Sequence, residues 1–140
     1  MTLKVSKAEI WTTAIEDRTG GAADRIEPLT GAGANFEFVF ARRTPEHPGQ
    51  GILFAGPIEG AKVRRAAEEA GFKRSETIHG IRVEGTDKAG TGARIARALA
   101  EAGISFRGIQ AAALGRNFVS FIALDSADDA ARAVKLLRKL

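Results

Sequence analysis

The feature that most constrains the fold of this chain is an internal repeat. Residues 17–36 align with residues 87–106 at a shift of 70 without a gap, and seven of the 20 positions are identical. The identities include an acidic residue, two glycines and an aromatic residue, at Asp17/Asp87, Gly20/Gly90, Gly33/Gly103 and Phe36/Phe106. The shift equals half of the 140-residue chain, as a duplicated module requires. We therefore expect two small modules, residues 1–74 and residues 75–140.

The second copy has the clearer pattern of strands and helices. Apolar alternation predicts a strand over residues 77–84. Two more strands are expected over 104–112 and 118–124, joined by a tight hairpin at 115–117. Apolar residues at helical spacing predict a helix over 91–102, and Ser126 followed by Asp129 is typical of the start of another. Since no strand pattern follows that helix, the fourth strand of this module is expected to be missing or supplied from elsewhere.

The first copy follows the same order. We expect strands at 8–15, 35–42, 51–55 and 72–77 and helices at 21–32 and 58–70. Pro28 lies inside the first helix and predicts a kink or a late start, because proline removes one backbone hydrogen bond. The order βαββαβ predicts an α+β fold of two ferredoxin-like modules, each an antiparallel sheet with its helices on one face.

Two of the predicted strands are apolar on both faces. Phe36, Phe38 and Phe40 share their strand with Val39 and Ala41, and residues 118–123 place apolar side chains on both faces of theirs, whereas a half-buried strand normally alternates apolar and polar residues. A covering partner for the second face or the edges is therefore expected, either the other module or a second copy of the chain. This pattern predicts a homodimer.

Composition narrows the class of protein. The chain is 44% hydrophobic and 27% charged, which is ordinary for a globular protein, and it has no cysteine for disulfides or thiolate metal sites. No run approaches the ~20 apolar residues of a membrane span, and the first residues lack a signal peptide pattern, so a cytoplasmic location is expected. Residues 71–140 hold 12 Lys and Arg against 7 Asp and Glu. These scattered cations leave nucleic-acid binding as an alternative, although a solvated surface is the commoner explanation.

The turn after the first strand of each copy resembles the ACT domain. That family typically has an Asp-Arg-Pro-Gly turn that opens a helix, and the helix ends in Ala-Gly before a strand. This chain has Asp-Arg-Thr-Gly at 17–20 and Asp-Lys-Ala-Gly at 87–90, with Ala-Gly at 32–33 and 102–103. Thr19 and Ala89 replace the proline, which leaves each turn less rigid. The resemblance covers nearly the whole chain as two copies and implies regulation by a bound amino acid.

ACT modules typically bind an amino acid where two modules meet, using this turn. The resemblance therefore implies a ligand site at Asp17, Arg18, Gly20, Gly21 and Asn35 in the first copy and at Asp87, Lys88 and Gly90 in the second. Glycines allow close approach to the backbone, and free N–H groups at a helix start favour a carboxylate. Either aspartate would pair with the ammonium group, and Asn35 or Ser105 would add a hydrogen bond. The paired glycines make the first copy the better candidate.

The same residues also have a purely structural interpretation. An aspartate and a glycine between strand and helix commonly form a cap and a tight turn, and Asn35 commonly begins a strand. Residues 115–121 partly resemble the RNA-binding strand of an RRM, but a core or interface strand is the better interpretation. His47 and His79 are too few for a metal site, and no catalytic motif is present, so no metal, cofactor or enzymatic activity is expected.

The sequence thus predicts a non-catalytic protein that binds an amino acid and acts on an unidentified enzyme. A ferredoxin-like nucleic-acid-binding protein is the alternative, and no membrane association is expected.

Overall fold

The computed structural model describes residues 2–140 and divides them into two compact units. The first, which we call the continuous unit, is Glu9–Ser75. The second, which we call the split unit, combines the residues up to Ala8 with Glu76–Leu140. The continuous unit is thus inserted into the sequence of the split unit, after its first strand.

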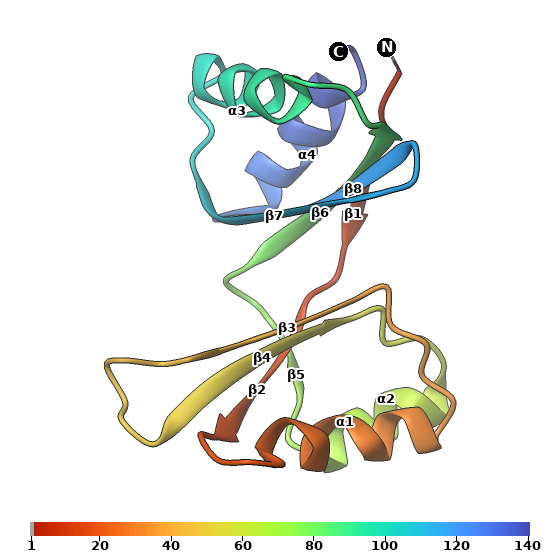
Figure 1. The fold of residues 1–140 in the computed structure, drawn as a ribbon, viewed down its shortest axis with the longest axis vertical. Coiled ribbons are helices and arrows are strands. Elements are labelled where there is room, and N and C mark those ends of the chain that lie inside the picture. The colour runs from red at the N-terminus through yellow and green to blue at the C-terminus, as the bar shows by residue number, and fades with distance from the viewer. Residues whose placement is uncertain (1) are drawn as a thin grey trace. The chain divides into compact units, whose positions relative to one another are not determined.

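The continuous unit is an antiparallel sheet with two helices on one face (Figure 1). Its elements are β2 (Trp11–Glu16), α1 (Gly21–Gly31), β3 (Phe38–Arg43), β4 (Gln50–Gly56), α2 (Ala61–Glu69) and β5 (Lys73–Arg74). The strands lie in the order β3-β4-β2-β5, so β3 and β5 form the edges.

The split unit has the same spatial arrangement of four strands and two helices, but a different chain order, because the strand that comes last in the continuous unit comes first here (Figure 1). Its elements are β1 (Lys4–Ala8), β6 (His79–Thr86), α3 (Thr91–Glu101), β7 (Phe106–Leu114), β8 (Asn117–Leu124) and α4 (Ala127–Leu137). The order β7-β8-β6-β1 places β7 and β1 at the edges, and β1 occupies the position that β5 has in the continuous unit.

The fourth strand of the split unit therefore comes from the N-terminus. The predicted division between residues 74 and 75 lies one residue from the observed one, but the assignment of the residues up to Ala8 to the first module is wrong. Lys4–Ala8 pairs antiparallel with β6, opposite Gly80–Glu84. The prediction of one strand over 8–15 missed this segment, because most of its residues are polar and only one of its apolar side chains, Val5, is strongly buried. Leu3 and Val5 are only 3% and 4% exposed and belong to the core of the split unit. Arg138 secures the strand by donating two hydrogen bonds to the carbonyl oxygen of Val5, at 2.8 and 3.0 Å.

Local signals in the sequence placed most helix ends correctly. The hydroxyl oxygen of Ser126 accepts a hydrogen bond from the backbone N–H of Asp129 at 3.0 Å, which confirms the predicted start of α4. Pro28 lies inside α1, which nevertheless begins at Gly21, so the late start is wrong.

Each unit has its own apolar core between its sheet and its helices. The two cores fill equivalent places with different residues. Gly51 of β4 lies beside Ile15 of β2, whereas in the split unit Phe118 of β8 lies beside Gly85 of β6. A Cβ atom at Gly51 would meet the Ile15 side chain at 3.1 Å, and one at Gly85 would meet the Phe118 ring at 3.1 Å. In each unit a large side chain thus lies beside a glycine of the neighbouring strand. The large side chain comes from the strand before the helix in the continuous unit, β2, and from the later strand in the split unit, β8.

Candidate functional site

The two predicted turns have the same backbone in both units. Each helix begins after a glycine in the left-handed region, Gly20 with φ 87° and Gly90 with φ 89°. The N–H of Asp17 donates to the carbonyl of Gly49, and the N–H of Asp87 donates to that of Arg116, so both turns are tied to the adjacent hairpin. Neither helix has a side-chain cap at its start. The aspartates are therefore turn residues and not helix caps.

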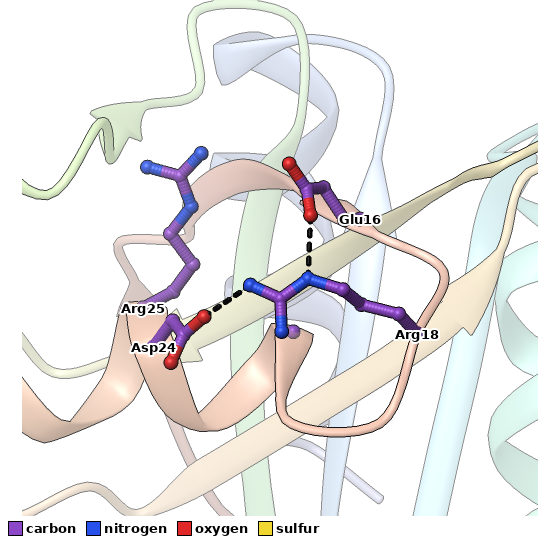
Figure 2. Close-up of a pocket in the computed structure, with 5 residues that line it drawn as sticks. Glu16, Arg18, Asp24 and Arg25 are labelled. Atoms are coloured by element: carbon purple, nitrogen blue, oxygen red, sulfur yellow. Dashed lines mark hydrogen bonds and ion pairs between the residues drawn. The ribbon is translucent and has the colours of Figure 1, made fainter.

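The first turn is occupied by its own arginine. The Arg18 guanidinium donates to Glu16 Oε2 at 2.5 Å, to Asp24 Oδ2 over a shorter distance, and to the Thr19 carbonyl at 3.1 Å. Figure 2 shows this side chain lying between the two carboxylates, over the start of α1. These hydrogen bonds, first to Glu16 and then to Asp24, raise the pKa of Arg18 above its ordinary value. The hollow that remains is about 130 Å³ and is lined largely by charged side chains.

Asp17 and Gly21, two further candidates in the first turn, also interact with other parts of the continuous unit. Asp17 accepts hydrogen bonds from Nε of Arg43 at 3.0 and 3.2 Å. A Cβ atom on Gly21 would lie 2.2 Å from the carbonyl oxygen of Glu16, so glycine is required there by packing within the turn. The expectation that paired glycines expose the first turn to a ligand therefore does not match its geometry.

The second turn opens onto a cavity of about 170 Å³ between α3 and the strands β7 and β8. Its polar lining comes from Asp87, Lys88, Thr91 and Ser120. Its apolar lining comes from Ile95, Phe118, Ile109 and Ala111 to Ala113. Gly92, in the first turn of α3, also lines the cavity, and a Cβ atom there would meet nothing within 4 Å. This cavity is larger and more apolar than the hollow at the first turn.

The charged groups at the second turn are not paired with each other or with neighbours. Within residues 2–140, neither the Asp87 carboxylate nor the Lys88 ammonium makes a hydrogen bond or ion pair with another side chain. The Ser120 hydroxyl, by contrast, is buried and donates to the carbonyl of Gln110 at 2.8 Å. The free carboxylate and ammonium groups, together with the N-terminus of α3, can bind a zwitterion by charge-assisted hydrogen bonds.

The structure separates Asn35 and Ser105 from the turns with which they were grouped. Asn35 follows α1, whereas Asp17, Arg18 and Gly20 precede it. A helix of 11 residues is about 16 Å long at a rise of 1.5 Å per residue, so Asn35 and the first turn lie at opposite ends of α1. Ser105 is separated from the second turn by α3 in the same way.

Several residues that contact these turns were missed from the sequence, among them Arg43, Asp24 and Ala113. Arg43 and Asp24 pair with turn residues, and Ala113 lines the open cavity. The repeat could have identified the strand positions, because Arg43 and Ala113 are related by the same shift of 70.

The remaining signals do not form a second site. Phe118, in the strand that partly resembles an RNA-binding motif, is 8% exposed and belongs to the core of the split unit. No group of three or more potential metal-binding His, Cys, Asp or Glu side chains occurs within residues 2–140. No helix in this range is long and apolar enough to cross a membrane.

No protein-family model matches the chain, and no curated protein matches it either. Several solved structures, however, are similar to the chain. Protein BT0572 from Bacteroides thetaiotaomicron has a TM-score of 0.76 at 17% identity, over 94% of this chain and 88% of that one. The regulatory subunit of aspartate kinase from Thermus thermophilus, in its ligand-free form, has a TM-score of 0.67 at 18% identity, over 99% and 96%.

The regulatory subunit of aspartate kinase from Thermus flavus is similar over 96% of this chain and 95% of its own, with a TM-score of 0.59 at 22% identity. At these identities the likeness concerns the fold. It agrees with the two antiparallel four-stranded sheets and four helices that residues 2–140 form. The chain therefore has the ACT-like α+β fold that its repeated turns predicted.

Proposed function

We propose that this protein is a non-catalytic regulatory protein that binds a free amino acid at the second turn, in the split unit. The cavity at Asp87 and Lys88 carries this proposal, because it joins an apolar wall to two unpaired charges of opposite sign. An amino acid has the complementary features, namely a carboxylate, an ammonium group and a side chain.

The orientation of the amino acid follows from the charges around the cavity. The first N–H groups of α3 have no carbonyl partner within their own helix, and the helix dipole adds partial positive charge there. The ligand carboxylate would bind at this end, near Lys88, and its ammonium group would pair with Asp87. The side chain would then pack against Ile95 and Phe118, which favours an apolar amino acid.

The regulatory part of the proposal is supported by the fold. Two of the similar solved structures are regulatory subunits of aspartate kinase. We propose that this chain likewise acts on a separate enzyme in the cytoplasm, through a change in stability or assembly when the amino acid binds.

Binding is tested by thermal shift with the common L-amino acids, one at a time. An amino acid at 100 times its dissociation constant is expected to stabilise the folded protein by about 2.7 kcal/mol. Gly92→Leu should abolish the shift, because the leucine side chain would enter the cavity from the first turn of α3 without a clash at Cβ. A side chain at Gly90 would be a poorer test, since its positive φ would strain the turn.

Gly92→Ala is the matched control for that experiment. Its single methyl group occupies little of the cavity, and the variant should bind with most of the wild-type affinity while gaining about 0.5–1 kcal/mol of helix stability. Normal binding by folded Gly92→Leu would place the ligand elsewhere and contradict the proposed site.

We also propose that the protein is a homodimer formed through its exposed sheet edges. The large exposed apolar side chains lie on the edge strands: Val39 and Phe40 on β3, and Phe106, Ile109 and Leu114 on β7. An edge strand of this kind presents unpaired backbone groups as well as apolar area, and a second copy would cover both. Light scattering at micromolar concentration should give twice the mass of the 14.8 kDa chain, and a monomer would remove this part of the proposal.

A further inference from the structure

We infer that the chain has a single amino-acid site because the charged groups of the first turn are paired within the chain, Asp17 with Arg43 and Arg18 with Glu16 and Asp24. The residue at position 43 or 113 then decides whether the turn aspartate is available to a ligand. The inference rests on the proposed function of the second turn. It assigns the first turn as a closed copy of the same site.

The strand register shows that Arg43 and Ala113 occupy equivalent positions. Arg43 of β3 lies opposite Gly51 of β4, which lies opposite Ile15 of β2. Ala113 of β7 lies opposite Phe118 of β8, which lies opposite Gly85 of β6. Each row has one residue from the edge strand and one from the strand that leads into the turn. The residues at the two ends of the first row, Arg43 and Ile15, correspond to those at the ends of the second row, Ala113 and Gly85, at the shift of 70.

The side chain at this position determines the state of the turn aspartate. In the continuous unit, Arg43 reaches Asp17 and pairs with it at 3.0 Å. In the split unit, Ala113 has no charge and leaves a cavity in front of Asp87. Asp17 therefore already has a cationic partner, whereas Asp87 is available to the ammonium group of a ligand.

The basic residue of the turn, Arg18 or Lys88, also has different neighbours in the two units. Arg18 is held by Glu16 and Asp24, but the residues at the equivalent places around Lys88 are Thr86 and Arg94. Without acidic partners, Lys88 remains free for a carboxylate. In the first turn, the two acidic residues neutralise the charge of Arg18. In the second turn, a neutral and a basic residue stand at these places, so the surroundings of Lys88 are electropositive.

The inference is tested by moving the blocking arginine into the open turn. Ala113→Arg should pair with Asp87 as Arg43 pairs with Asp17, and Ala113 is exposed on an edge strand, so the variant should fold. Affinity for the amino acid that gives the largest thermal shift should fall by about tenfold or more, since the ammonium group loses a charge-assisted hydrogen bond. Ala113→Gln, of similar reach without the charge, should keep most of the affinity.

Titration calorimetry of the wild-type chain should also give one amino acid per chain. Arg43→Ala should leave the affinity of the second turn unchanged, because Arg43 belongs to the other unit. Equal binding by folded Ala113→Arg and Ala113→Gln, two amino acids per wild-type chain, or loss of binding in Arg43→Ala would each overturn the inference while the proposed function stands. A wild-type protein that binds no amino acid would overturn both.

Discussion

Deletion of residues 2–8 is expected to unfold the split unit while the continuous unit stays folded. The deletion removes Leu3 and Val5, whose burial contributes about 1.5–3 kcal/mol for each side chain, and the whole ladder between β1 and β6. It also exposes Ile81 and Val83 and removes the carbonyl that accepts hydrogen bonds from Arg138. A small domain has only about 5–15 kcal/mol of stability in total, so this loss should exceed what the unit can bear.

Amide NMR spectra of the deletion variant check this result. Signals from Glu9–Ser75 should remain dispersed, because that unit has a complete sheet and its own core. Signals from Glu76–Leu140 should collapse to unfolded positions. The double substitution Lys4→Ala/Lys7→Ala, which removes side chains from the same segment but none from the core, should leave both sets dispersed. Dispersed signals from 76–140 after the deletion would show that β1 is dispensable.

Replacement of Gly21 by threonine is expected to destabilise the continuous unit strongly, although threonine stands at the equivalent position, Thr91, in the other unit. A Cβ atom at Gly21 would lie 2.2 Å from the Glu16 carbonyl oxygen, a backbone atom that cannot move without reshaping the turn. Overpacking of this kind typically costs about 1–3 kcal/mol, and the lost Arg18 geometry would add to that cost. The midpoint of denaturant unfolding should fall accordingly.

Gly31→Ala is the control for this substitution. Gly31 is the last residue of α1, and a Cβ atom there would meet nothing within 4 Å. Alanine should therefore be neutral or slightly stabilising, by at most about 0.5–1 kcal/mol. If Gly21→Thr unfolds at the same midpoint as Gly31→Ala, the first turn is not packed as tightly as the structure shows.

Local physical signals in the sequence determined the elements and the turns. The alternation of apolar residues located β6, the helical spacing located α3, and the pair Ser126 and Asp129 located the start of α4, because each of these signals acts between neighbours in the chain. The repeat at a shift of 70 further identified the two turns as equivalent. Backbone geometry agrees, since Gly20 and Gly90 have nearly the same positive φ.

Tertiary structure alone decided which strand completes each sheet and which turn is open. β1 carries one strongly buried side chain, Val5, with Leu3 just before the strand, and its pairing with β6 joins segments more than 70 residues apart, so no local pattern shows it. The pairing of the Asp17 carboxylate depends on Arg43, which lies 26 residues away in the sequence and is brought near the first turn by the pairing of β3 with β4. Local spacing in the sequence specifies the secondary structure. The charge and the free space at each turn depend instead on residues of distant strands, which come close to the turn only when the sheets form.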